Sequence, residues 1–239
     1  MARGEVFTAE IQRIAAGGAG IARPDGKSVF IDLTAPGDVA RFRVTADHKT
    51  WAEAELLEVL EPSAQRTAAE CALYGRCGGC NLQHINYQAQ VDIKAAILKD
   101  AFARIGGLLA PEPRIRTGEP FGCRNRFRFH TRPASGESGN VGDGAVCGFM
   151  ERKSSNFIAV DDCPVAESGI RKALKEGTLA RQIKESNKNP DKDKFTVYSR
   201  GKTFLVEGET ERGCVSILDK EIALDVKIFF QSNASMLEL

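Results

Sequence analysis

The 239-residue chain carries 33 lysines and arginines against 32 aspartates and glutamates, for a formal net charge of +1, and 42% of its residues are hydrophobic. This composition is typical of a globular protein with one large core or a few smaller ones, and any basic surface has to be local. No apolar run approaches the roughly 20 residues of a membrane span, and the N-terminus lacks the apolar core of a signal peptide. We expect a soluble protein of the reducing cytoplasm with no membrane partner.

The first sixty or so residues alternate between apolar and polar types in short segments, which predicts strands. These segments cover residues 6–11, 28–31, 39–44 and 51–59. Turn signals rich in glycine and proline separate them, and together they predict a small barrel. The glycines at 17, 18 and 20 precede a strand instead of a helix, so they are expected to serve turns and not to bind a dinucleotide. Such barrels often bind single-stranded nucleic acid, but without a strong basic excess the contact would be auxiliary.

Three cysteines, Cys71, Cys77 and Cys80, lie in a glycine-rich turn with C-x5-C-x2-C spacing. Gly78 and Gly79 let the backbone fold tightly, so that amide N–H groups can point at sulfur atoms. Cys163, in an Asp-Asp-Cys-Pro sequence, is the best candidate for a fourth thiolate. The weaker candidates are Cys123, Cys147 and Cys214. An iron–sulfur cluster is favoured over a structural zinc site, and disulfides rank last because seven is an odd number.

A helix is expected directly after the cysteines. Asn86 can cap its first turn, and Val91, Ala95, Leu98 and Phe102 repeat at helical spacing. Paired glycines at 106 and 107 and a proline at 111 end it.

Residues 123–132 alternate with period two, which predicts a strand with one largely apolar face. The other face presents a row of basic side chains about 7 Å apart. We call this set the basic row: Arg124, Arg126, Arg128, His130 and Arg132. The row suits a phosphate backbone and indicates RNA contact. The alternative is an exposed sheet face whose arginines pair with acids on the next strand.

The remaining pattern predicts further strands, one helix and two polar loops. The strands cover 145–150, 157–160, 195–199 and 203–207, the helix covers 167–186, and the loops cover 136–144 and 188–194.

Three of these segments carry a resemblance to a known family. The opening segment, ending in Trp51-Ala-Glu-Ala-Glu-Leu-Leu-Glu-Val-Leu-Glu-Pro-Ser, resembles a TRAM domain, a small RNA-binding barrel. The cysteine turn followed by Leu82-Gln83-His84, Tyr87 and Gln90 resembles the iron–sulfur motif of the S-adenosylmethionine-dependent RNA uracil-5-methyltransferases. Phe229-Phe230-Gln231-Ser232-Asn233 is similar to the FFQxN segment that opens their methyltransferase domain. The three motifs stand in the family's order.

The resemblance implies an α+β protein with a TRAM-like, OB-like barrel at 1–63, an iron–sulfur and RNA-binding domain of mixed antiparallel sheet and helix at 64–224, and the start of a truncated Rossmann-like methyltransferase domain at 225–239. It makes Cys71, Cys77, Cys80 and Cys163 the ligands of a [4Fe-4S] cluster and Gln231 a contact to S-adenosylmethionine. The alternative for Gln231 is a residue at the start of a helix with no ligand. The barrel and the cluster together favour ribosomal RNA over transfer RNA as the substrate.

In the family, a cysteine adds to carbon 6 of an unstacked uridine and activates carbon 5 for methylation. That cysteine lies near the far end of the catalytic domain, so Cys214 does not inherit its role and no catalytic residue is assigned. The sequence ends at Leu239, directly after the FFQxN segment. We therefore expect a fragment, a truncated reading frame or a short protein, inactive alone and acting with a missing or separate catalytic domain. The alternative is a stand-alone RNA-binding module with a structural iron–sulfur or zinc site.

Overall fold

The computed structural model describes residues 1–109, 111–133, 145–186 and 192–239. The chain divides into two compact units. The first unit consists of Met1–Gly75 and Cys80–Ile115, and the second consists of Arg76–Gly79 and Arg116–Leu239. The fold is mixed α+β with a sheet-rich N-terminal region, as predicted. None of the helices within the described ranges combines the length and apolar character that a bilayer crossing requires.

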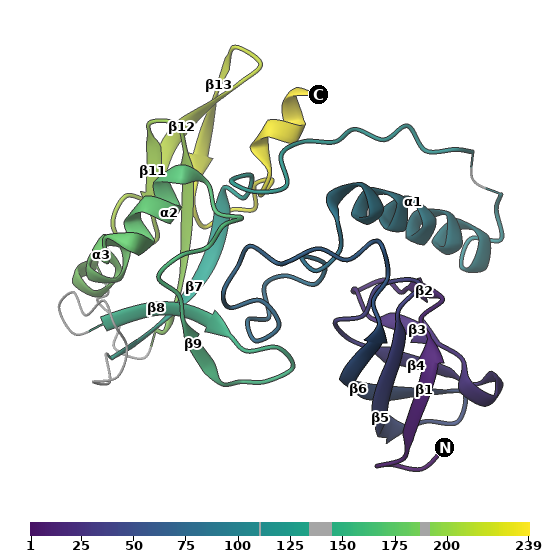
Figure 1. The fold of residues 1–239 in the computed structure, drawn as a ribbon. Coiled ribbons are helices and arrows are strands. Elements are labelled where there is room, and N and C mark those ends of the chain that lie inside the picture. Colours follow the sequence, from purple (N-terminus) through teal and green to yellow (C-terminus); the bar gives the residue numbers. More distant parts are fainter. Residues whose placement is uncertain (110, 134–144, 187–191) are drawn as a thin grey trace. The chain divides into compact units, whose positions relative to one another are not determined.

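Six strands form the sheet of the first unit in the order β1-β5-β6-β4-β3-β2 (Figure 1). The strands are β1 (Val6–Glu10), β2 (Arg13–Ile14), β3 (Gly20–Ala22), β4 (Ser28–Ile31), β5 (Val39–Asp47) and β6 (Trp51–Glu61). A 3-10 turn, η1 (Pro24–Gly26), precedes β4. Strand β1 pairs with β5, and its continuation β2 pairs with β3, so the sheet closes on itself. The predicted barrel of short strands is confirmed.

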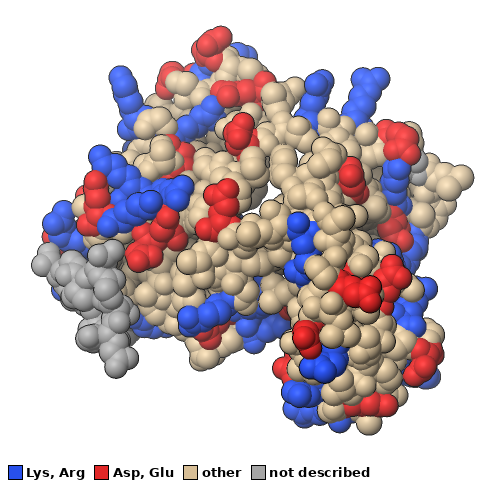
Figure 2. All heavy atoms as spheres, in the orientation of Figure 1, with Lys and Arg blue, Asp and Glu red and all other residues tan. Residues whose placement is uncertain are grey.

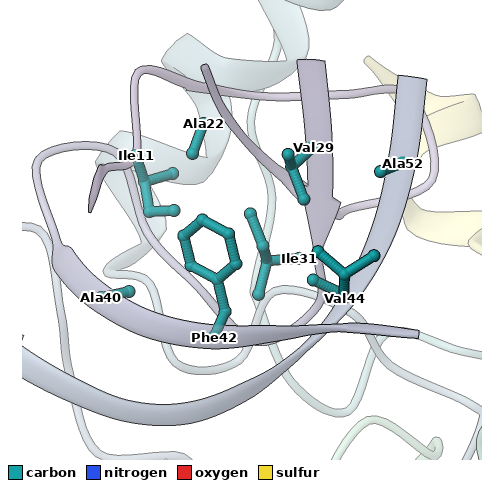
Figure 3. Packing of buried hydrophobic residues seen from close by; sticks show 9 residues of the cluster. Ile11, Ala22, Val29, Ile31, Ala40, Phe42, Val44 and Ala52 are labelled. Atoms are coloured by element: carbon teal, nitrogen blue, oxygen red, sulfur yellow. The ribbon is translucent and has the colours of Figure 1, made fainter. Parts of the chain in front are cut away.

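The barrel core is built from the alternate residues of its strands. Figure 3 shows Phe42 and Val44 of β5, Val29 and Ile31 of β4 and Ala52 of β6 pointing into one interior. Phe42 is fully buried. This alternation explains why four strands could be predicted, whereas β2 and β3 are too short to show it. Gly17 and Gly18 both adopt φ of +97°, which confirms that they serve a turn.

One helix, α1 (Tyr87–Arg104), completes the first unit. The Asn86 side chain caps it as predicted, because its Oδ1 accepts a hydrogen bond from the Ala89 N–H at 2.9 Å. The expected apolar face was wrong. Ala89 and Ile93 are buried against residues of the barrel and the cysteine segment, whereas Leu98 and Phe102 are 46% and 44% exposed.

The second unit contains a five-stranded antiparallel sheet in the order β11-β10-β7-β8-β9. Its strands are β7 (Arg126–Pro133), β8 (Ala145–Met150), β9 (Phe157–Ala159), β10 (Lys194–Arg200) and β11 (Thr203–Val206). The helices α2 (Ser168–Lys175) and α3 (Thr178–Ser186) lie against β10 and β8. The prediction of one helix over 167–186 was wrong, because Gly177 adopts φ of +68° and separates the two.

A hairpin of β12 (Arg212–Ile217) and β13 (Lys220–Asp225) follows β11, and neither strand was predicted. Together with Val226 and Ala234, its apolar residues bury Tyr198 of β10. The chain then runs through the segment 227–233 into a 3-10 helix, η2 (Ala234–Glu238). The predicted loop at 136–144 and most of the loop at 188–194 lie outside the described residues.

Candidate functional site

A buried ion pair between Asp38 and Arg66 lies where the barrel ends and the segment that carries Cys71, Cys77 and Cys80 begins. The Asp38 carboxylate accepts two hydrogen bonds from the Arg66 guanidinium, both at 2.8 Å, and further ones from the N–H groups of Ser63 and Ala35. Burial alone would raise the pKa of Asp38, but the bonds from Arg66, Ser63 and Ala35 outweigh it and lower that pKa. Arg66 also donates to the Leu33 carbonyl at 2.9 Å, so the chain leaves the barrel in one fixed direction.

Cys71 and Cys80 belong to the first unit, where side chains around them hold the loop. The Cys71 N–H donates to Gln83 Oε1 at 3.2 Å. Tyr74 Oη bonds the Asn81 carbonyl and His84 Nδ1, and its ring stacks on that of His84. These contacts give Gln83 and His84 structural roles in the loop that carries the cysteines.

Cys77 belongs to the second unit, in the short segment Arg76–Gly79 that pairs with the end of β8 and the residues directly after it. The Gly78 N–H donates to the Met150 carbonyl at 3.0 Å, and a Cβ at Gly78 would lie 3.1 Å from that oxygen. Close backbone approach therefore favours glycine here. The Gly79 N–H donates to Cys77 Sγ at 3.4 Å, which confirms the expected amide-to-sulfur contact.

Cys163 is buried in the turn that leads into α2. Its carbonyl accepts a hydrogen bond from the Ala166 N–H at 2.9 Å. The neighbouring Asp162 forms a bidentate pair with Arg171, at 2.6 and 2.9 Å, and an ion pair with Lys175. The hydrogen bonds from Arg171, and then from Lys175, lower the pKa of Asp162.

The four expected cluster ligands are thus two cysteines of each unit. None of the seven cysteines forms a disulfide, so all are thiols. The structure gathers no group of three or more His, Cys, Asp or Glu side chains suited to a metal within its described residues. Burial raises the pKa of the Cys147 thiol in β8 to about 12, and Cys214 is exposed on β12. The donor chemistry of the remaining cysteines fits a thiolate-bound cluster.

The basic row does not present five equivalent side chains. Arg124 and Arg128 are exposed, and Arg128 forms no ion pair with any described residue. Arg126 is half-buried and donates to the Val226 carbonyl at 3.2 Å, and burial lowers its pKa. The alternative of pairing with acids holds for His130 and Arg132. Both bond Asp193, immediately before β10, at 3.2 and 2.9 Å.

These two hydrogen bonds, first that of Arg132 and then that of His130, lower the pKa of Asp193.

The opposite parity of the strand is buried as predicted. Phe127 and Phe129 are 4% and 0% exposed, and both contact Phe149 of β8, with Phe129 stacked on it and Phe127 tilted against it. The sequence therefore predicted the apolar face of β7 correctly, and on the basic row the structure leaves Arg124 and Arg128 free of acidic partners among the described residues.

Gln231 is exposed in the segment between Val226 and η2. One buried side chain, Asn125, fixes this segment. The Asn125 N–H donates to the Ser232 carbonyl at 2.6 Å, its Oδ1 accepts from the Ala234 N–H at 3.0 Å, and its Nδ2 donates to the Ser199 carbonyl at 2.7 Å. This role of Asn125 was not predicted, although a polar residue on the apolar parity of a strand indicates a buried side chain that needs hydrogen-bond partners.

Comparison with protein families identifies a TRAM domain at residues 2–57. The chain is 38% identical over 165 residues to the 23S rRNA (uracil(1939)-C(5))-methyltransferase RlmD of Chromohalobacter salexigens, covering 69% of this chain and 33% of that protein. It is 36% identical over 166 residues to the RlmD of Legionella pneumophila, covering 68% of this chain and 36% of that protein. The chain therefore contains a TRAM domain and has RlmD-type homologues. It spans about a third of the length of these relatives.

A solved structure shares the fold. The Pyrococcus abyssi tRNA (uracil-54, C5)-methyltransferase, in complex with S-adenosyl-L-homocysteine, matches with a TM-score of 0.60 at 20% sequence identity. The match covers 96% of this chain and 62% of that one. At this level of identity the likeness shows the fold alone.

Proposed function

We propose that this chain is the RNA-binding and iron–sulfur portion of an S-adenosylmethionine-dependent 23S rRNA uracil-5-methyltransferase of the cytoplasm. The observation that carries the proposal is the identity of 36–38% to two RlmD proteins over about two thirds of the chain. The TRAM domain at residues 2–57 supports RNA as the partner. The alternative of a stand-alone binding module has no comparable support, because both of these relatives of the chain are methyltransferases by name.

RNA binding by this chain has to rely on local contacts. On the face drawn in Figure 2, basic and acidic side chains are interspersed, and neither sign covers a large continuous area. Arg124 and Arg128 are the exposed members of the basic row, and neither bonds Asp193, as His130 and Arg132 do, or Val226, as Arg126 does, so they are the members best placed to bind phosphates.

The test is binding of a 23S rRNA fragment that contains uridine 1939, the position named for the two RlmD relatives. Measured by fluorescence anisotropy, the chain should bind the labelled fragment more tightly than it binds an unrelated RNA of equal length. Equal affinity for both, or no binding, would overturn the ribosomal RNA assignment.

We propose that Cys71, Cys77, Cys80 and Cys163 hold a [4Fe-4S] cluster. All four are thiols, and the Gly79 amide already donates to the sulfur of Cys77. Anaerobically purified protein should contain about four iron and four sulfide per chain. Cys80→Ser should lose most of this iron, while the matched control Cys214→Ser, on exposed β12, should keep it. A colourless protein with one zinc would refute the cluster in favour of the zinc site.

We propose that Gln231 contacts S-adenosylmethionine, which supplies the methyl group when bound. Asn125 would hold Gln231 in place through the hydrogen bonds of Ser232 and Ala234. The 239-residue polypeptide covers about a third of the RlmD relatives, and we expect no methyl transfer from it alone. Labelled methyl incorporated into the 23S rRNA fragment above background would contradict that expectation.

A further inference from the structure

Two aromatic rings lie on the outer face of the barrel, where polar residues are usual. Val29 and Ile31 of β4 and Ala52 of β6 point inward, so their neighbours Phe30 and Trp51 point outward. The two rings meet edge to face, with centroids 5.6 Å apart. Neither ring belongs to the buried barrel core, and each keeps part of its surface exposed.

A third ring extends this pair into solvent. His48 stacks on Trp51 with centroids 3.9 Å apart and an interplanar angle of 24°. Its N–H donates to the Trp51 carbonyl at 2.9 Å, in the turn that joins β5 to β6. Because His48 is exposed, its outer face is open to a further planar group. Phe30, Trp51 and His48 form what we call the aromatic platform.

The charges beside the platform are compatible with nucleic-acid binding, but they are too few to be its main source of affinity. Lys49 is exposed next to His48 and forms no ion pair with any described residue. Lys27 bonds Asp47 at 2.5 Å, and this hydrogen bond, with the charge of Lys27, lowers the pKa of Asp47. Asp47 is therefore a neutralised acid. On the outward face of β6, Glu55 is paired with Arg43 at 2.8 Å, and Glu53 forms no ion pair with any described residue. Binding here would come mainly from stacking, with Lys49 as a phosphate contact.

We propose that the aromatic platform stacks an unpaired base of single-stranded RNA, with the base lying on His48 and Trp51. Every base has a π-face, so such a site accepts different sequences. The proposal rests on the proposed RNA-binding function and assigns it a particular surface. It differs from the phosphate contacts of the basic row in its chemistry, since stacking releases no counterions and is insensitive to salt.

Trp51 is the single tryptophan of the chain, so its fluorescence reports on the platform alone. A twelve-nucleotide single-stranded RNA should quench this emission with the same midpoint as the anisotropy of the labelled RNA. His48→Ala and Trp51→Phe test the rings without removing a core residue. Each should weaken binding several-fold, and Trp51→Ala roughly tenfold, equivalent to about 1.4 kcal/mol. The matched control is Phe102→Ala, an aromatic residue of α1 that is 44% exposed, which should bind as the wild type does.

The ratio of wild-type to His48→Ala affinity should stay constant between about 50 and 200 mM salt, because the lost contact is not ionic. RNA that binds by anisotropy without changing the emission of Trp51, together with unaltered affinity of His48→Ala and Trp51→Phe, would overturn the platform and leave the RNA-binding function standing. Absence of any anisotropy change in the wild type would overturn the RNA-binding function itself. The two failures are therefore distinguishable.

Discussion

Replacing Asn125 with alanine should release the segment that carries Gln231. The Asn125 side chain is 4% exposed and makes two hydrogen bonds to buried backbone groups, the Ser199 carbonyl and the Ala234 N–H. A buried group that loses its partner costs about 1–3 kcal/mol, so two such groups cost about 2–6 kcal/mol. We expect Asn125→Ala to lower the free energy of unfolding of the second unit by about 3 kcal/mol.

Hydrogen exchange gives a sharper readout than global stability. The Ala234 N–H donates to Asn125 Oδ1, so its exchange should accelerate strongly in the variant. The control is Asn156→Ala, whose side chain bonds Glu151 at 3.3 Å on the surface and whose loss should change stability by less than about 0.5 kcal/mol. An Asn125→Ala protein with unchanged stability and unchanged exchange at Ala234 would refute the reasoning.

Two further predictions concern the first unit. Asp38→Asn should destabilise it at neutral pH by about 3 kcal/mol, because the variant breaks a buried ion pair with Arg66. Since the folded pKa of Asp38 is lowered, its carboxylate stabilises the fold above the unfolded pKa of about 3.9, and the stabilisation is lost as the pH falls through the folded pKa. Urea unfolding at several pH values checks this, and a pH-independent difference between variant and wild type would contradict it. Ile93→Ala should lower the free energy of unfolding by about 2–4 kcal/mol, whereas Phe102→Ala should lower it by less than about 1 kcal/mol. Equal losses of stability in urea unfolding would show that the buried face of α1 is misassigned.

The sequence predicted most strands of both units because their alternation is strict. Val29 and Ile31, or Phe127 and Phe129, share a face whatever packs on them. The face of α1 could not be chosen in the same way. Its apolar residues fall on more than one side of the helix, so helical spacing identifies the helix but leaves the choice between Ile93 and Phe102 to the tertiary contacts.

In the candidate sites, too, some features follow from the local sequence and others depend on tertiary contacts. The glycine at 78 and the amide of Gly79 follow from local backbone chemistry and could be predicted. The clamp of Asn125 on Ser232 and Ala234 joins residues more than 100 positions apart. No local pattern indicates such a pairing. The aromatic platform is intermediate. Alternation predicts that Phe30 and Trp51 point outward, but it does not predict that the two rings are in contact.

The basic row shows why a polar strand face is not by itself a binding surface. Arg126 and Arg128 share that face, yet Arg126 donates to the Val226 carbonyl while Arg128 stays exposed. Each phosphate contact to single-stranded RNA contributes about 0.7 to the slope of log affinity against log salt. Four arginines acting together would contribute about 2.8, whereas Arg124 and Arg128 alone contribute about 1.4.

The double variant Arg124→Ala with Arg128→Ala should therefore flatten the salt dependence of RNA binding by about 1.4, measured by anisotropy over a range of salt concentrations. Arg132→Ala, the matched control, should leave the slope unchanged because Arg132 is bound to Asp193. A loss near 0.7 in the control would mean that RNA displaces Asp193, and the whole row would then act as one phosphate-binding surface. An unchanged slope in the double variant would remove the row from the RNA interface, and phosphate contacts would have to be sought elsewhere, beginning with Lys49 beside the aromatic platform.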